Sequence, residues 1–189
     1  MRYFVLLGVL VGCVHNPTVP VNLLAQVPPD TVQQTEPLMR RIEALDSEIA
    51  VATRQAEQAR SLEAAQAERV DALDDLQSGN RDLKRMAVER GDATAATAAD
   101  ATSAERSSTL EVARADLAAA EIAAGSAEAN LTLLQAEREV TTAELELTRA
   151  QSIGPEALSV EPFQRALDNA VVRRDEAAER AADAESAHQ

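Results

Sequence analysis

Few side chains in this sequence are of types and spacings that could carry out chemistry. The two histidines, His15 and His188, lie in terminal segments, where the sequence predicts no fixed partner for acid–base catalysis or metal binding. Asp71, Asp74 and Asp75 form a carboxylate cluster, but on a helix they point partly apart, so we expect a solvated face. The sequence also lacks the short motifs of zinc hydrolases, phosphate-binding loops and serine hydrolases. We therefore predict that the protein is not an enzyme and has no cofactor, no metal and no small-molecule substrate.

The single cysteine, Cys13, ends the apolar run FVLLGVLVGC. This run has half of the roughly 20 apolar residues that a membrane-spanning helix needs. A basic residue, Arg2, precedes the run and small residues end it, which is typical of a secretory signal peptide. In the simplest alternative, an ordinary signal peptide is followed by a free cysteine.

The last four residues of the run specify the type of signal peptide. Leu10, Val11, Gly12 and Cys13 resemble the lipobox of bacterial lipoproteins, in which an aliphatic residue, a variable residue and a Gly or Ala precede the cysteine. The resemblance implies that residues 1–12 are a lipoprotein signal peptide, cleaved between Gly12 and Cys13, and that Cys13 carries lipid. Several acyl chains anchor a protein far more firmly than one. Because Val14 rather than Asp follows the cysteine, the resemblance implies an outer-membrane anchor facing the periplasm.

The composition favours long helices and excludes one class of partner. The net charge is −14, whereas nucleic-acid binding requires a basic surface, so we expect no nucleic-acid partner. Aromatic residues make up 2% of the chain, and Phe163 is the only one beyond the signal peptide. An Ala-rich composition with many Glu and Arg residues and helical periodicity is typical of coiled coils.

Residues 13–36 contain four prolines, Pro17, Pro20, Pro28 and Pro29. Prolines at this density disfavour regular helix, so we predict an extended tether between the lipid and the folded part. In an alternative interpretation, the segment NLLAQV packs back onto the first helix.

The first long helix is predicted over residues 37–90, with Thr35 as its cap and Pro37 in its first turn. Apolar residues spaced by three and four predict a coiled-coil seam, which slips by one residue after Leu62. We expect a local irregularity at Gly79 and Asn80, because glycine is unfavourable inside a helix. The predicted seam consists of Ile42, Leu45, Ile49, Ala52, Ala56 and Ala59, and then of Leu73, Leu76, Leu83 and Met86.

The chain is predicted to reverse within residues 91–107, in a stretch that has no Leu, Ile or Val. Two capping-box patterns, one from Thr102 to Glu105 and one from Ser108 to Glu111, mark possible starts of the next helix. Alternatively, the alanines of this stretch stay helical and the two helices are continuous. Arg90, Gly91 and Asp92 spell a tripeptide of cell-adhesion ligands, which we interpret as coincidence.

The second long helix is predicted over residues 108–152, with a seam that keeps its register throughout. Further apolar residues widen the stripe beyond a two-stranded seam, which predicts more than one neighbouring helix. The seam consists of Leu110, Ala113, Leu117, Ala120, Ala124, Ala127, Leu131, Leu134, Arg138, Thr141, Leu145 and Thr148. The flanking residues are Val112, Leu133, Val140 and Leu147.

Gly154 and Pro155 break this helix, which predicts a loop over residues 153–161 and a third helix over residues 162–187. Together these elements predict an all-α fold, in which a long antiparallel helical hairpin packs with a shorter third helix. We interpret Phe163 as a plug in the core where the third helix meets the hairpin, or alternatively as an exposed contact. The candidate interaction residues are Leu133, Val140, Leu147 and Phe163.

The lipobox, the proline-rich tether and the Ala-rich heptads together resemble bacterial lipid-anchored coiled-coil lipoproteins of the cell envelope. The resemblance implies a structural, scaffolding or interaction role, a membrane contact through the lipid on Cys13, and partners that are other envelope proteins or further copies of the chain. A second resemblance covers Leu110–Gln151, which looks like the α-hairpin of periplasmic adaptors and outer-membrane efflux proteins. The flanking lipoyl, β-rich or barrel segments of those families are missing here. The alternative function is therefore an accessory subunit docking on a trans-envelope transport assembly.

Overall fold

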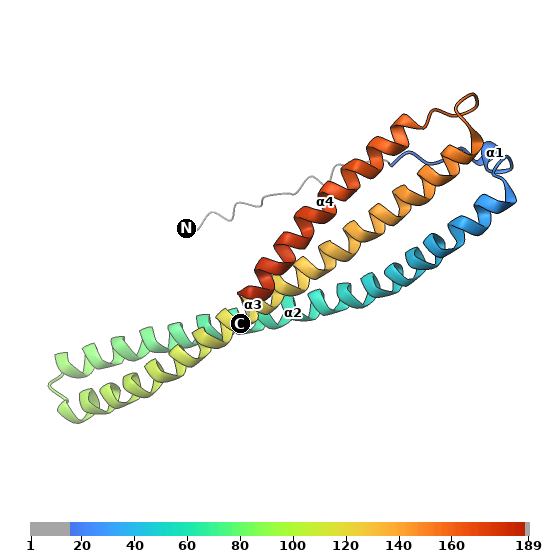
Figure 1. Cartoon of the computed structure of the whole chain (residues 1–189). Coiled ribbons are helices and arrows are strands. Elements are labelled where there is room, and N and C mark those ends of the chain that lie inside the picture. The colour runs from blue at the N-terminus through green and yellow to red at the C-terminus, as the bar shows by residue number, and fades with distance from the viewer. Residues whose placement is uncertain (1–15, 188–189) are drawn as a thin grey trace. The chain divides into compact units, whose positions relative to one another are not determined.

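The computed structural model of the chain describes residues 16–187, so the predictions on the signal peptide, the lipobox and Cys13 lie outside the described residues. Four helices follow one another: α1 (Val21–Leu24), α2 (Pro29–Glu89), α3 (Ala93–Ile153) and α4 (Glu161–Ser186) (Figure 1). Residues 16–187 contain no strand. The predicted all-α fold, with two long helices that pack against each other and a shorter C-terminal helix, is confirmed.

The chain divides into two compact units, and α2, α3 and α4 each contribute to both. Unit 1 consists of Met1–Ala44 and Ala136–Arg174, and unit 2 of Leu45–Gln135 and Asp175–Gln189.

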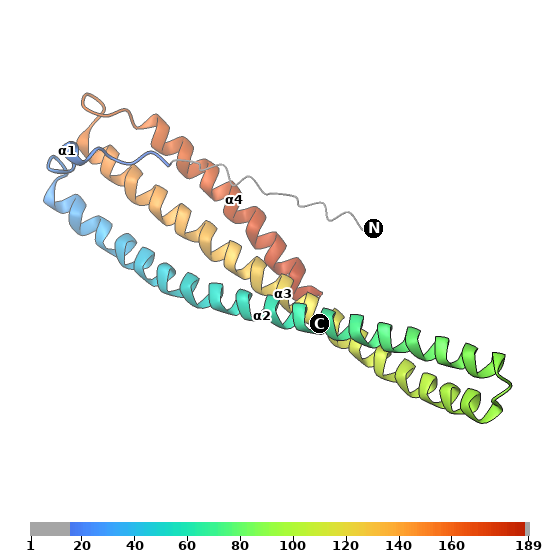
Figure 2. The same cartoon turned by 180° about the vertical axis from the view of Figure 1, so that it is seen from behind.

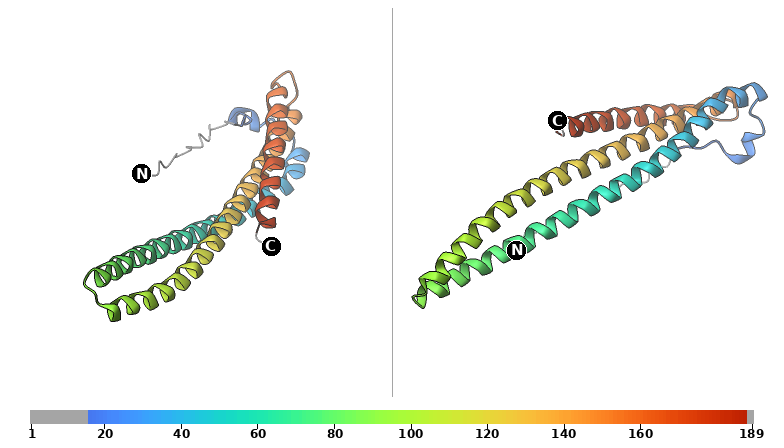
Figure 3. Two further views of the ribbon diagram at one scale, coloured as in Figure 1. Left: turned by 90° about the vertical axis from the view of Figure 1, so that its left-hand side faces the viewer. Right: turned by 90° about the horizontal axis from the view of Figure 1, so that it is seen from below.

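In unit 2, α2 and α3 form an antiparallel hairpin, and further views show the two helices side by side (Figures 2 and 3). Buried and half-buried positions in α3 follow the predicted seam from Leu110 and continue upstream to Ala99. In α2, by contrast, the seam shows no slip. The seam passes through Val70, Gln77, Asn80 and Ala87, so the predicted seam positions Leu76, Leu83 and Met86 are wrong. These three side chains are 52%, 61% and 41% exposed.

Two amide side chains of α2 explain the uninterrupted seam. Asn80 Nδ2 donates to the Ala99 carbonyl at 2.8 Å and to Ser103 Oγ at 2.7 Å. Gln77 Nε2 donates to Ser107 Oγ at 2.9 Å. These bonds cross to α3 and satisfy the buried amide groups. Gln77 and Asn80 can therefore occupy the core positions of α2, although the apolar pattern predicts that Leu76 and Leu83 occupy the seam. α2 also continues through Gly79 without a break.

The hairpin turn is far shorter than the predicted turn over residues 91–107. The N–H of Gly91 donates to the Val88 carbonyl at 3.0 Å and the N–H of Asp92 to the Ala87 carbonyl at 2.9 Å, which is a Schellman motif. Gly91 has a φ of +74°, a conformation that favours glycine. Asp92 Oδ1 then caps α3 by accepting the Ala95 N–H at 2.9 Å.

The two capping-box predictions are therefore wrong, because Thr102 and Ser108 lie inside α3. The Thr102 hydroxyl donates instead to the Ala98 carbonyl at 3.0 Å. The Ala-rich stretch that was predicted to hold the turn is helical, as expected from the high helix propensity of alanine.

In unit 1, α2 begins at Pro29, eight residues before its predicted start at Pro37. Pro29 is the first helical residue, where the missing N–H has no helical partner. Pro37 lies inside the helix, so the Gln33 carbonyl loses one helical donor, and water can replace it because Gln33 is exposed. Thr35 does not cap α2, because it is buried within the helix and its hydroxyl donates to the Val32 carbonyl at 3.1 Å.

The N-terminal segment of unit 1 packs against the folded core instead of extending away from it. Val19 is 4% exposed and shares a hydrophobic cluster with Leu147, Ala150 and Phe163, against which Leu23 also packs. The segment therefore packs back, as the alternative interpretation held, but its cluster is formed with α3 and α4. The prediction of an extended tether over residues 13–36 is wrong for these packed residues.

The C-terminal half of unit 1 agrees closely with the predicted boundaries. α3 ends at Ile153, Gly154 has a φ of +91°, and α4 begins at Glu161. Within unit 1, α4 packs on α3 through a second cluster of Val140, Ala143 and Ala170. The wide stripe of α3 thus finds the additional neighbour that its width predicted.

Candidate interaction surface

Three of the four predicted interaction residues are buried within the chain itself. Val140 and Leu147 are covered in the two clusters with α4, and Phe163 is 4% exposed. The interpretation of Phe163 as a core plug is confirmed, and Phe163, Val140 and Leu147 are wrong as exposed contacts. The physical reason is that the stripe shows how much apolar surface needs a neighbour, but not whether α4 or another chain supplies it. Leu133, in unit 2, is half-buried.

Several large apolar side chains are exposed on one side of the unit 2 hairpin. In α2, Leu62, Leu76 and Leu83 stand at multiples of seven residues, so they share one side of the helix, and Met86 lies one turn beyond Leu83. Grooves along this side are lined by Leu62 with Ala119 and Ala123 of α3, and by Leu83 and Met86 with Ala98 of α3. We call these seven residues, Leu62, Leu76, Leu83, Met86, Ala98, Ala119 and Ala123, the groove face.

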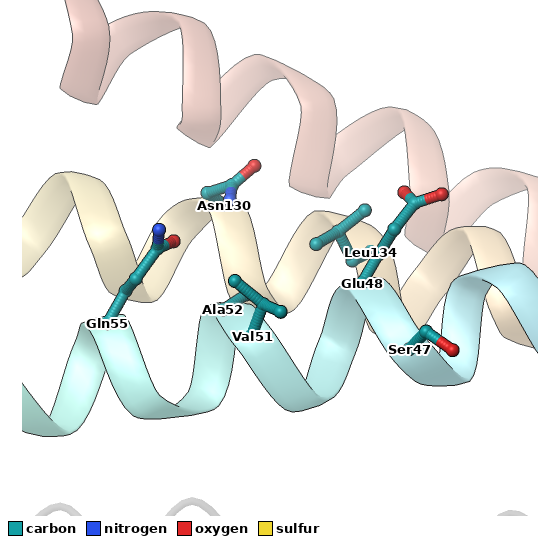
Figure 4. Close-up of a pocket in the computed structure, with 7 residues that line it drawn as sticks. All are labelled: Ser47, Glu48, Val51, Ala52, Gln55, Asn130 and Leu134. Atoms are coloured by element: carbon teal, nitrogen blue, oxygen red, sulfur yellow. The ribbon is translucent and has the colours of Figure 1, made fainter.

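The same side of unit 2 continues into a further groove at the end of unit 2 away from the turn (Figure 4). Val51 and Gln55 of α2 and Asn130 and Leu134 of α3 line this groove, and Gln55 and Asn130 project toward the same side of the helix pair. Gln55 precedes Leu62 by seven residues and Asn130 follows Ala123 by seven. At this end of unit 2, Gln55 and Asn130 thus stand where Leu62 and Ala123 stand one heptad nearer the turn. The groove face is therefore limited to the part of the hairpin nearer its turn.

Ion pairs between the two helices are concentrated on the opposite side of the hairpin. Arg114 pairs with Asp74 at 3.0 Å and Lys84 pairs with Asp100 at 2.5 Å. Arg60 also pairs with Glu128, and this hydrogen bond raises the pKa of Arg60 above its ordinary value. Such exposed pairs contribute little to stability, but their charged groups keep this side solvated.

One ion pair lies on the groove-face side, where Arg69 Nη1 and Asp116 Oδ2 are 2.9 Å apart. Arg69 occupies the position midway between Leu62 and Leu76 in the seven-residue spacing. The apolar residues of the groove face are therefore accompanied on this side by the Arg69–Asp116 pair, by Arg90 and Asp92 in the groove nearest the turn, and by Arg106, whose Nη1 donates to the Leu76 carbonyl at 2.7 Å.

The described residues offer no constellation for metal chemistry. Within residues 16–187, no group of three or more His, Cys, Asp or Glu side chains is placed to hold a metal ion. In the predicted carboxylate cluster, Asp74 is engaged by Arg114. None of the helices in this part of the chain is both long and apolar enough to span a membrane.

Comparison with protein-family models, with curated proteins and with solved structures gives no match to this chain. The interpretation of the groove face therefore depends on its own geometry and chemistry.

Proposed function

We propose that the protein is a lipid-anchored coiled-coil lipoprotein of the bacterial outer membrane, facing the periplasm, and that it acts as a structural or scaffolding element of the cell envelope. The observation that carries the scaffolding role is the groove face. The α2–α3 hairpin of unit 2 already has a continuous seam, and yet it exposes Leu62, Leu76, Leu83 and Met86 on one side. Contiguous exposed apolar surface is characteristic of contact sites for other macromolecules.

The groove face has the form of a helix-binding surface. Its leucines repeat at the seven-residue spacing that matches a neighbouring helix. The charged opposite side stays in water, so binding on the groove face leaves the solubility of the hairpin intact. In this proposal the protein positions its partners by geometry and performs no catalysis.

The anchoring part of the proposal rests on the lipobox resemblance at Leu10–Cys13. Metabolic labelling with an alkyne fatty acid tests it, with Cys13→Ser as the comparison. Since Cys13 is the only cysteine, no other thiol can take up the label. We expect the wild type to be labelled and to sediment with outer membranes, and the variant to lose both properties. A labelled variant, or an unlabelled wild type that is secreted without lipid, would contradict the anchor.

The scaffolding part is tested separately by photocrosslinking in the native cell. A photoreactive residue at Leu83 on the groove face should capture a specific helical partner or a second copy of the chain. A residue at Val88, which is equally exposed on α2 but lies outside the groove face, serves as the control. Equal, unspecific capture from both positions would argue against the groove face as a contact site.

One observation favours the alternative function, an accessory subunit that docks on a transport assembly. The hairpin ends in a narrow three-residue turn, and Val88 beside it is 60% exposed. The turn could therefore enter a recess of a larger complex. A photoreactive residue at Thr97, which is exposed near the turn, would capture a channel or pump component under this alternative. Capture from Leu83 alone would argue against it.

A further inference from the structure

We propose that the groove face binds the groove face of a second copy, in a parallel arrangement in which α2 of each hairpin lies over α3 of the other and the two turns point the same way. This inference deepens the proposed scaffolding role by naming its partner, and it does not depend on lipidation of Cys13.

The argument begins with the rows of residues that cross the groove face. Leu62 shares a groove with Ala123, Arg69 pairs with Asp116, and Leu83 shares a groove with Thr102. In each row the larger or positively charged side chain belongs to α2, and the smaller or negatively charged one belongs to α3. The groove face thus has a ridge along α2 and a shelf of small residues along α3.

A two-fold axis along the hairpin exchanges α2 and α3 within every row. Leu62 then lies over Ala123 of the second copy, and Leu83 lies over Thr102 of the second copy. Each ridge therefore meets a shelf, and large residues facing small ones allow helices to interdigitate at native packing density. Because every row maps onto itself, no shift along the helices is needed to bring the two copies into register.

The charges of the central row favour the same arrangement. In it, Arg69 of one copy lies over Asp116 of the other, so four charges of alternating sign meet at the centre. A two-fold axis across the hairpin would instead place Arg69 over its own symmetry mate and Leu62 over Leu76. Like charges would then face each other, and bulky residues would meet bulky residues, which disfavours the antiparallel dimer.

The overall charge of the chain also selects this surface for self-association. At a net charge of −14, two copies repel each other over most of their surfaces. On the groove-face side Arg69 pairs with Asp116, Arg90 and Asp92 line the groove nearest the turn, and Arg106 Nη1 donates to the Leu76 carbonyl at 2.7 Å, so each of these acidic groups has a basic group on the same side. The groove face is therefore a surface on which two acidic chains can approach with little repulsion.

The first test is sedimentation equilibrium of the full-length protein in detergent solution. The double substitution Leu76→Glu and Leu83→Glu should weaken dimerisation by about a hundredfold or more, because each copy would bring two carboxylates into an apolar interface. Val88→Glu is the matched control, since Val88 is as exposed as Leu83 on the same helix, and it should leave the dimer unchanged. Helix content measured by circular dichroism should be equal in all three proteins. A wild type that stays monomeric at all concentrations, or equal weakening by the control, would overturn the proposal.

The second test fixes the orientation of the two copies. A photoreactive residue at Leu62 is crosslinked in a mixture of ¹⁵N-labelled and unlabelled full-length protein, so that mass spectrometry separates crosslinks between copies from those within one. The parallel arrangement predicts crosslinks to the segment around Ala123 of the other copy. Crosslinks between copies that map around Leu76 would overturn this orientation. A monomeric protein that still takes up fatty-acid label and captures another envelope protein would refute this inference while leaving the proposed function intact.

Discussion

The backbone N–H of Val19 donates a 2.6 Å hydrogen bond to Oε2 of Glu146, a residue 127 positions further along the chain. Glu146 is largely buried, and its other carboxylate oxygen accepts a 2.8 Å bond from Arg149. Through this carboxylate the N-terminal segment of unit 1 is held on α3, and the Val19 side chain is kept in its cluster with Phe163.

We predict that Glu146→Ala releases residues 16–24 from unit 1. The substitution leaves the buried Val19 amide without an acceptor, which costs about 1–3 kcal/mol. Amide hydrogen exchange at Val19 and Leu23 should accelerate accordingly. Glu144→Ala, at a half-buried position two residues earlier on α3, is the control and should leave the exchange unchanged. Equal protection in both variants would show that the carboxylate does not hold the segment.

A pair of glycine substitutions in unit 2 should have opposite effects. At Gly79, inside α2, an added Cβ meets no heavy atom within 4 Å, so Gly79→Ala should stabilise the protein by about 0.5–1 kcal/mol. At Gly91 the space is equally open, but φ is +74°. Gly91→Ala should therefore destabilise the hairpin by about 1–2 kcal/mol through backbone strain alone. Thermal denaturation followed by circular dichroism measures both, and shifts of the same sign would contradict the assigned turn.

Asn80 provides a test of the polar seam. Asn80→Ala removes two hydrogen bonds to α3 and leaves the Ser103 hydroxyl without this donor, so we expect a loss of about 1–2 kcal/mol in the free energy of unfolding. Asn80→Leu restores apolar volume, and polar core residues often specify register at the expense of stability. We therefore expect Asn80→Leu to recover stability. Urea denaturation of the two variants checks this, and a leucine variant that is less stable than the alanine variant would contradict the seam assignment.

The sequence predicts the fold well where helix boundaries depend on local chemistry. Gly154 and Pro155 end α3 almost where predicted, and the seam of α3 follows its apolar residues because few polar residues interrupt it. The shorter third helix follows from the same helix breakers, and the width of the α3 stripe predicts the additional neighbour that this helix supplies. In these places a single physical signal, apolar periodicity or a helix breaker, decides the structure.

The errors arise where polar side chains compete with apolar periodicity. Gln77 and Asn80 satisfy their amides across the hairpin, so they hold the core positions and displace Leu76 and Leu83 to the surface. A seam continued by strict spacing from Leu45 would have revealed this displacement, and with it the groove face. The turn lies at the start of the predicted range, but its length is wrong, because Gly91 and Asp92 together end one helix and start the next.

The docking of Val19 would also limit the distance between the folded chain and a bilayer. If Cys13 carries lipid as proposed, the segment that links the lipid to Val19 runs only from position 13 to position 19. Even fully stretched, a chain of that length covers about 20 Å. A tether that was free up to Pro37 would have reached several times as far. Val19 is then held within about 20 Å of the lipid headgroups, and lipid anchoring would concentrate neighbouring copies on one surface.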